Sequence, residues 1–185
     1  MPSSPQPTLW RTCRVLASRK RLQMLACLIR HPGQTVSAVA QQTRLSMPAA
    51  SQYLRALETR GLLTCRRVAK RVEYRPAPAT SDSAGAEIVD ALRLAFGRGE
   101  QPADAIFKLA TAFTHPRRIE VFRALKKGAA SFAKLQAATH ISARALARHL
   151  SKLKSRGFVK REKQIWMLNV PRHPLARALA RLARG

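Results

Sequence analysis

The sequence predicts a mainly α-helical (α+β) protein in which one structural unit, a set of short helices followed by a small β-hairpin, occurs twice. The main observation is an internal repeat: residues 21–28 match residues 118–125, and residues 54–63 match residues 150–159. In both copies apolar residues recur at the spacing of amphipathic helices, and short strand-like runs follow them. A repeat of this length indicates two copies of one domain, and the 185-residue chain can hold both.

The first copy is expected to contain four helices and a hairpin. The helices are expected over residues 8–17, 19–29, 35–42 and 46–60, and the strands over residues 62–67 and 71–75. Thr8 and Ser46 are the predicted N-cap residues of the first and the last of these helices. Pro32-Gly33 ends the second helix, and Gly61 ends the fourth with a left-handed residue.

The second copy repeats this plan after a connecting region. Residues 1–7 are expected to be a disordered tail, and residues of about 76–86 are predicted to be a linker from their Pro, Ala and Ser content. An amphipathic helix over residues 87–96 and a break at 97–102 follow. The later helices are expected over residues 103–113, 117–126, 131–138, 142–156 (capped by Ser142 and ended by Gly157) and 174–183, with strands at 158–161 and 165–169. The domains are therefore predicted at 8–97 and 103–183.

The charge of the chain is strongly positive and unevenly distributed. Lys and Arg number 35 against 9 acids, which gives a net charge of +26. No acid precedes Glu58 or follows Glu162, and most of the acids lie between residues 73 and 104. A surplus this large exceeds what solubility requires and predicts a polyanionic partner for the two copies rather than for the connector.

Several function classes find no support in the sequence. Cys13, Cys27 and Cys65 form neither a metal-binding pair nor an even-numbered framework, which favours a reducing cytoplasm. No stretch resembles a signal peptide or a membrane span, so no membrane partner is expected. The chain also lacks a phosphate-binding glycine loop, a nucleophile elbow and a usefully spaced carboxylate pair, so we do not expect an enzyme.

The helix that begins at Ser46 resembles the recognition helix of ArsR-type winged-helix regulators. That family shows a Leu-Ser-Gln-Pro start, a Ser-x-His-Leu middle and a Leu-x-x-x-Gly-Leu-Val end. Residues 45–63 keep this order, with Met47, Tyr53 and Leu63 in place of the Gln, the His and the Val. The second copy keeps Ile141-Ser142, His149-Leu150 and Gly157-Phe158-Val159. The resemblance implies two tandem winged helix-turn-helix domains, each with a β-hairpin wing.

The resemblance also implies a dimer joined through terminal helices and, in many members, a Cys-x-Cys metal site. That site would fall on Thr35 and Ser37 in the first copy and on Ser131 and Ala133 in the second, and none of these binds a soft metal ion as thiolates do. We therefore expect no metal and no cofactor. The terminal helices of the two copies could pack together as a pseudo-dimer within one chain, or the chain could form a homodimer.

A helix-turn-helix places its recognition helix in the major groove of double-stranded DNA and offers the N-terminal and outward residues to base edges. Gln52 suits adenine, whereas Arg148 at the aligned position suits guanine, which predicts unequal half-sites. Basic residues of the wings suit phosphate or minor-groove contacts. The candidate DNA contacts are Met47, Ala49, Ser51, Gln52, Arg55, Arg66, Arg67, Lys70, Arg71, Ala143, Arg144, Arg148, His149, Lys152, Lys160, Arg161 and Lys163.

Three functions remain open from the sequence. The first is a cytoplasmic, nucleoid-associated transcriptional regulator, whose small-molecule effector the sequence does not identify. The second is an architectural protein of nucleoid or replication type that coats DNA with little sequence preference, which the net charge favours. The third is a protein-interaction module, against which the acid-free first 57 residues argue.

Overall fold

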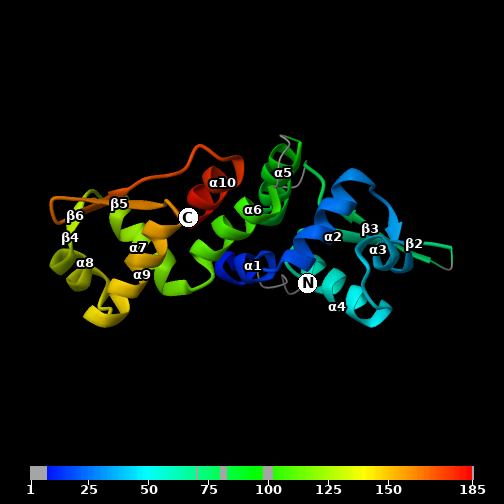
Figure 1. The fold of residues 1–185 in the computed structure, drawn as a ribbon, viewed down its shortest axis with the longest axis horizontal. Helices are drawn as coiled ribbons and strands as arrows, with labels where there is room; N and C mark the ends of the chain where they lie inside the picture. Colours follow the sequence, from blue (N-terminus) through cyan, green and yellow to red (C-terminus); the bar gives the residue numbers. More distant parts are fainter. Residues whose placement is uncertain (1–7, 70, 80–82, 98–101, 185) are drawn as a thin grey trace, which may run out of the picture.

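The computed structural model describes residues 8–69, 71–79, 83–97 and 102–184, and it contains two similar units joined end to end (Figure 1). The first unit comprises α1 (Leu9–Leu16), α2 (Arg19–Arg30), β1 (Gln34–Thr35), α3 (Val36–Thr43), α4 (Met47–Glu58), β2 (Leu63–Val68), β3 (Arg71–Pro76) and α5 (Ala84–Phe96). The second comprises α6 (Pro102–Ala110), the 3₁₀ helix η1 (Thr111–Phe113), α7 (Pro116–Lys126), β4 (Ala130–Ser131), α8 (Phe132–Thr139), α9 (Ala143–Ser155), β5 (Val159–Glu162), β6 (Ile165–Leu168) and α10 (Pro174–Arg184).

The predicted fold class is confirmed: the helices and strands expected from the sequence are present, with shifted ends, in a mainly α-helical chain with small hairpins. The helix expected over 103–113 is divided, because its last turn is the 3₁₀ helix η1. The expected tail at 1–7 and the expected break at 98–101 lie outside the described residues.

Each unit has a three-stranded antiparallel sheet, and the sequence pattern does not predict one strand of each. The strand orders are β1-β3-β2 and β4-β6-β5. Gln34 of β1 faces Tyr74 of β3, and Ala130 of β4 faces Trp166 of β6. A two-residue strand has no periodicity of its own. It forms because a strand that is distant in the sequence lies beside it.

Three helices begin at the N-cap residues that the sequence predicts, but only one of these side chains makes a capping hydrogen bond. Ser46 caps α4 as predicted, since the backbone N–H of Ala49 donates to its Oγ. Ser142 and Thr8 stand at the predicted N-cap positions of α9 and α1, although neither side chain makes a capping hydrogen bond. Both side chains are exposed, where water can satisfy the first N–H groups of a helix.

The prediction of a linker over about residues 76–86 is wrong at both of its bounds. Residues 80–82 within it lie outside the described part of the chain. Pro76 is the last residue of β3 and faces Leu63, while α5 begins at Ala84. Gly85 lies inside α5 and is buried, and a Cβ on it would lie 2.2 Å from the carbonyl oxygen of Gly61. The missing side chain therefore lets α5 pack directly against the turn that ends α4, where Gly61 has the predicted positive φ of 66°.

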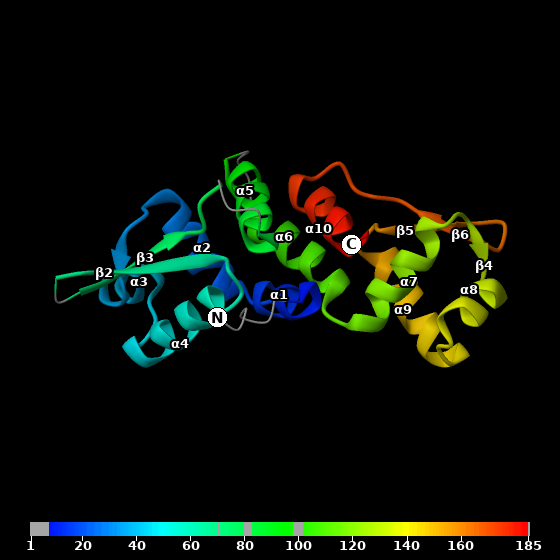
Figure 2. The same cartoon turned by 180° about the vertical axis from the view of Figure 1, so that it is seen from behind.

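Four helices form the centre of the molecule, between the two helix-turn-helix regions (Figures 1 and 2). α5 packs against α10, and α1 packs against α6 and η1. By their places in the repeat, α5 is the counterpart of α10 and α1 is the counterpart of α6. Each of these contacts therefore joins a helix to its own counterpart in the other unit.

Acids of the connecting region form ion pairs between the two units. Asp104 of α6 accepts from Arg19 of α2 at 2.8 Å, and Glu87 of α5 accepts from Arg181 of α10 at 2.6 Å. The guanidinium of Arg19 also lies 4.9 Å from the centre of the Phe107 ring. Exposed ion pairs add little stability, so these contacts favour one relative orientation of the units more than they strengthen the fold.

One hydrophobic core continues through both units and the central helices. The positions predicted to face inward on the two recognition helices, Leu54, Leu57, Leu150 and Leu153, are fully buried. In the second unit the ring of Phe113 packs edge-on against the rings of Phe122 and Phe158, with centroids 5.2 and 4.8 Å away. Because the core is continuous, removing one unit would expose apolar surface of the other.

Candidate nucleic-acid interface

The recognition helix of the first unit, α4, presents a narrow polar stripe to solvent. Met47 is 50% exposed, and Gln52 and Arg55 are also exposed. Ala49 and Ser51 are half-buried on the edges of this stripe. The opposite face is held by the buried leucines of the core, so the orientation of the stripe is set by packing rather than by the polar residues.

The recognition helix of the second unit, α9, presents a more basic stripe. Ala143, Arg144 and Arg148 are exposed, as the sequence predicts. Ser151 and Lys154 continue the stripe and were not among the candidate contacts. The repeat offers a signal for Ser151, since it aligns with the exposed Arg55.

Two candidate contacts of α9 point away from this stripe. The ring of His149 is half-buried and lies 4.9 Å from the ring of His115. Lys152 is half-buried too, and its burial, together with the nearby charges of Arg156 and Arg118, lowers its pKa. Both side chains lie on the side of α9 that faces η1 and the start of α7 rather than on the exposed stripe. The helical period is consistent with this, because His149 lies about 100° and Lys152 about 40° around the helix from Arg148, both in the same direction.

The position of His149 belongs to an arrangement that both units share. In the first unit Tyr53 takes that place, and the guanidinium of Arg21 lies 5.6 Å from its ring centre. Arg21 donates to the carbonyl of Val15 at 2.6 Å, and its counterpart Arg118 donates to the carbonyl of Thr111 at 3.4 Å. Arg21 therefore ties α1 to the recognition helix, whereas Arg118 ties η1 to α7.

The two wings differ in how their basic residues are engaged. In the first wing Arg66, Arg67 and Arg71 are exposed, while Lys70 at the turn lies outside the described residues. In the second wing Lys160 donates to Glu162 at 2.6 Å and the guanidinium of Arg161 lies 5.6 Å from the centre of the Trp166 ring. Lys163 is exposed in the turn, with a positive φ of 43°. The arginines of the longer first wing are therefore the more available for contacts with a partner.

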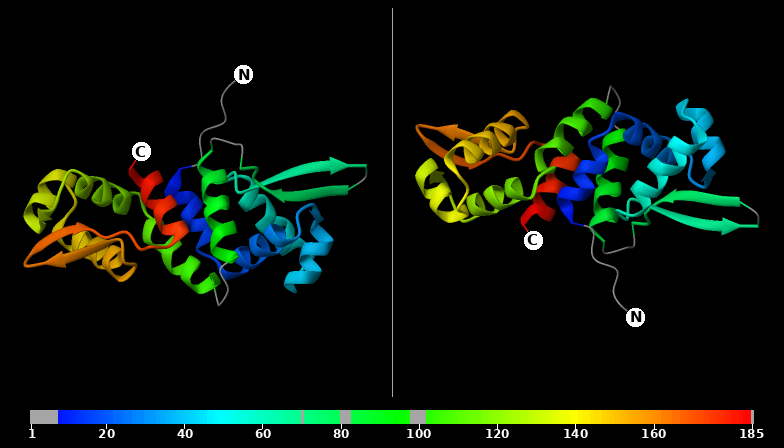
Figure 3. Two further views of the ribbon diagram at one scale, coloured as in Figure 1. Left: turned by 90° about the horizontal axis from the view of Figure 1, so that it is seen from above. Right: turned by 90° about the horizontal axis from the view of Figure 1, so that it is seen from below.

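Both recognition helices lie on one side of the molecule. In Figure 1 α4 and α9 descend to the lower side, whereas α5 and α10 occupy the upper side. The wings extend to opposite ends, with the four central helices between them, as Figure 3 shows from above and from below. A duplex that runs along the long axis could thus meet both recognition helices and both wings.

A basic cluster that the sequence pattern does not predict lies where the two units meet. His115 precedes α7, and its pKa is lowered by burial and by the charges of Arg118, Arg117 and Arg14. Arg14 belongs to α1 of the first unit, and the side chains of Arg14, His115 and Arg117 are exposed. Positive charge therefore continues between the two recognition helices. Only the packing of α1 against the second unit reveals it.

The thiols and the sites aligned with the family's metal ligands offer little to a metal ion. Burial raises the pKa of Cys13 and of Cys27, and a hydrogen bond with Glu58 raises that of the exposed Cys65. The hydroxyls of Thr35 and Ser37 lie 2.9 Å apart. Within the described residues no group of three His, Cys, Asp or Glu side chains could hold a metal ion, and no helix is long and apolar enough to cross a membrane.

Comparison with known families agrees with this geometry. Residues 19–66, from α2 into β2, match the IclR helix-turn-helix domain, and residues 115–161, from the start of α7 into β5, match the family described as bacterial regulatory protein, arsR family. The chain carries two winged helix-turn-helix domains in tandem. A search of curated proteins gives no match.

The two family matches differ, so the ArsR-type resemblance expected for both units holds for only one of them. The ArsR-type resemblance is confirmed for the second unit. It is corrected for the first, which matches the IclR type. The recognition helix of the first unit fits the IclR match, because Met47 and Tyr53 depart from the ArsR pattern. At the position of Tyr53 the second unit keeps the histidine of that pattern, His149.

Proposed function

We propose that the protein is a transcriptional regulator that binds double-stranded DNA with both units at once, as a pseudo-dimer within one chain. The observation that carries this proposal is the contact of α5 with α10 and of α1 with α6, because it joins counterparts and leaves α4 and α9 on the same side. In dimeric helix-turn-helix proteins such an arrangement places two recognition helices about 34–36 Å apart, one turn of the duplex.

The exposed residues divide into base-reading and phosphate-binding groups. Gln52 and Arg148 reach from the middle of the recognition helices and suit adenine and guanine edges in the major groove. Arg66 and Arg67 of the first wing suit phosphate or minor-groove contacts, and the cluster of Arg14 and Arg117 suits the backbone between the half-sites. The proposed DNA site is therefore asymmetric, with one half-site for each unit.

The proposal places the protein at the nucleoid in the cytoplasm and requires no metal ion for DNA binding. It does not depend on a second copy of the chain, since both halves of the interface are already present. An enzymatic activity forms no part of it.

Selection of bound duplexes from a random pool, followed by sequencing, tests the proposal. We expect two unlike half-sites separated by about one helical turn, and an affinity for the selected sequence about 10³-fold or more above that for random DNA. The Arg148→Ala variant should lose the preference in one half-site only. A footprint confined to a single half-site that Arg148→Ala leaves unchanged would refute the pseudo-dimer.

A second candidate function is a low-specificity architectural DNA-binding protein. The net charge of +26 favours it, since phosphate contacts alone can support such binding. A ratio of specific to random affinity near one in the same selection would establish this candidate instead. Failure to bind any duplex at low salt would exclude both and favour a protein partner.

A further inference from the structure

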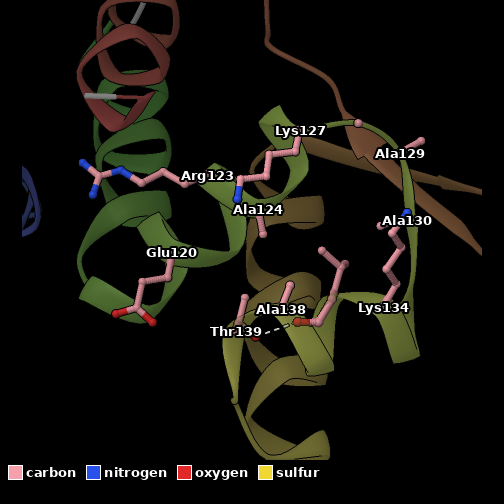
Figure 4. A pocket seen from close by; sticks show the side chains of 11 residues that line it. Glu120, Arg123, Ala124, Lys127, Ala129, Ala130, Lys134, Ala138 and Thr139 are labelled. Atoms are coloured by element: carbon pink, nitrogen blue, oxygen red, sulfur yellow. Dashed lines mark hydrogen bonds between the residues drawn. The ribbon is translucent and has the colours of Figure 1, made fainter.

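A cavity of about 380 Å³ lies between α7 and α8 of the second unit (Figure 4). Three alanines, Ala124, Ala130 and Ala138, form part of its wall together with Leu135. Its volume falls in the range of small-molecule sites, which are largely apolar with a few polar groups. No residue of α9 or of the wing strands β5 and β6 lines it, so it is separate from the candidate DNA surface.

The first unit has the same groove, but there a chain of hydrogen bonds bridges it. The Sγ of Cys27 donates to Oε1 of Gln42 at 2.8 Å, and Nε2 of Gln42 donates to Oε1 of Gln34 at 2.9 Å. The pocket beside them measures only about 170 Å³.

The repeat aligns these three polar residues with the three alanines. Cys27 aligns with Ala124, Gln34 with Ala130 and Gln42 with Ala138. The second unit thus has alanine at every position of the bridge. Alanine is compatible with both the helices and the strand, but it has no polar group that could close the groove. The cavity is therefore specific to the second unit and is not a general property of this fold.

The charged residues at the cavity favour an anion. Glu120 accepts from Arg117 at 2.8 Å, and Arg123 donates to the carbonyl of Ala183 at 2.8 Å, so both have partners within the protein. Lys127 and Lys134 also line the cavity, and neither has a carboxylate partner among the described residues. In Figure 4 the Lys127 side chain extends towards Ala124 and that of Lys134 towards Ala130. Two ammonium groups thus flank an apolar wall.

We propose that this cavity is a binding site for a small organic carboxylate with an apolar body, the acid group held by Lys127 or Lys134 and the body packed against Ala124, Ala130, Ala138 and Leu135. The ligand class follows from the volume, the alanine wall and the two lysines. A sugar or a nucleotide would require more hydrogen-bonding groups than this wall provides.

The cavity is connected to both parts of the DNA-binding apparatus. Ala138 and Thr139 line it at the end of α8, and His140 follows directly, with a positive φ of 51°, in the turn that leads to α9. On the other side Arg123 joins α7 to the C-terminal end of α10, one of the central helices. A ligand between α7 and α8 can therefore bias the position of α9. This regulatory role rests on the proposed function, whereas the binding site does not.

Calorimetric titration of the full chain with octanoate and with phenylacetate tests the binding site. We expect saturable binding of one molecule per chain by at least one of the two acids, and binding weaker by about 10-fold or more for octanamide and phenylacetamide, which lack the charge. No saturable binding of either acid at millimolar concentration would overturn the proposal.

Variants locate the bound acid. Ala124→Cys with Ala138→Gln restores two members of the bridge and should abolish binding, while Lys127→Gln with Lys134→Gln should weaken it by about 10-fold or more. Lys126→Gln, an exposed change on α7 outside the cavity, is the matched control and should bind as the unchanged protein does. Thermal unfolding and binding to random DNA report whether each variant is folded. Binding that survives in a folded bridge-restoring variant would refute the site.

A separate measurement tests the coupling to DNA. The acid that binds should change the affinity for the selected duplex in the unchanged protein and not in the bridge-restoring variant. An acid that binds the cavity and leaves DNA affinity unaltered would refute the regulatory role while the binding site stands. If the unchanged protein shows no specific DNA binding when no acid is present, that result contradicts the proposed function and leaves the binding site untouched.

Discussion

Gln52 and Arg148 occupy the same position of the two recognition helices, and both side chains are exposed. The helices that carry them, α4 and α9, lie on the same side of the molecule (Figure 1). The leucines that follow them, Leu54 and Leu150, are equally buried, so the scaffold under the two residues is alike. The units therefore differ in the side chain exposed at this position rather than in the packing of the helix beneath it.

Exchange of Arg148 for glutamine should make the two half-sites more alike. An arginine that contacts guanine contributes about 1–3 kcal/mol of discrimination, so Arg148→Gln should lose that preference at one base pair of the original site. Lys154→Gln, on the same exposed stripe, is the control and should weaken binding to all sequences equally. Sequencing of selected duplexes and gel-shift titrations measure both effects. A base preference unchanged in Arg148→Gln would show that this residue does not read a base.

Removal of basic residues from the first wing should make DNA binding less dependent on salt. Each phosphate contact contributes about 0.9 to the slope of log affinity against log salt concentration, so Arg66→Gln with Arg67→Gln should lower that slope by roughly twice this value. Arg177→Gln changes an exposed residue of α10, a helix on the opposite side of the molecule from α4 and α9 (Figure 1), and should leave the slope unchanged. Fluorescence titrations at several salt concentrations provide the measurement. Equal slopes in all three proteins would exclude the wing from the interface.

Substitution of Gly85 by alanine should destabilise the fold. The added Cβ would lie 2.2 Å from the carbonyl oxygen of Gly61, so α5 must shift away from the end of α4. Overpacking of this kind costs about 1–3 kcal/mol, and each kcal/mol lowers the melting temperature of a protein of this size by about 2–4 °C. Gly97→Ala, whose nearest contact would be 3.4 Å away, is the control. A melting temperature that Gly85→Ala leaves unaltered would contradict the close packing.

The histidine pair should make stability fall as the pH decreases. The pKa values of His115 and His149 are lowered in the folded protein, first by burial and then by neighbouring positive charge. Above the unfolded pKa of about 6.5 both states are neutral, and no effect arises. As the pH falls below that value the unfolded chain takes up protons that the folded chain resists, so the free energy of unfolding decreases until the folded pKa values are passed.

Urea unfolding at several pH values between about 7 and 5.5 measures this effect, in a range where carboxyl groups of ordinary pKa remain ionised. His115→Asn with His149→Gln should remove part of the decrease, and Asn keeps a side chain that can cap α7 at position 115. A decrease as large in the double variant as in the unchanged protein would show that other groups cause it.

Much of the architecture could be predicted because it depends on local patterns. The spacing of Leu54, Leu57, Leu150 and Leu153 identified the buried faces of both recognition helices, and Gly61 marked the end of the first. Other features depend on contacts between distant residues. The strands β1 and β4 and the helical position of Gly85 exist because of their neighbours in space, and the composition around Gly85 is equally typical of a linker.

The candidate site was predictable in outline and less so in detail. Repeat alignment placed Gln52, Arg55 and Arg148 correctly on exposed surfaces. It did not show that His149 turns towards His115, since that depends on how α9 packs against the start of α7. The alanine-lined cavity leaves no motif in the sequence, because alanine is compatible with any helix. Only the contrast with the hydrogen-bonded bridge of the first unit reveals it.

The presence of both halves in one polypeptide, packed together through α5, α10, α1 and α6, has a quantitative consequence for gene control. A regulator assembled from two separate chains must first associate, so at low abundance its occupancy of a site rises with the square of its concentration. Under the proposed function, this protein carries both reading surfaces from the moment it is synthesised, and occupancy rises in direct proportion to the number of molecules. A cell could therefore set its response with very few copies. The two halves could also change independently, because neither must remain complementary to a copy of itself.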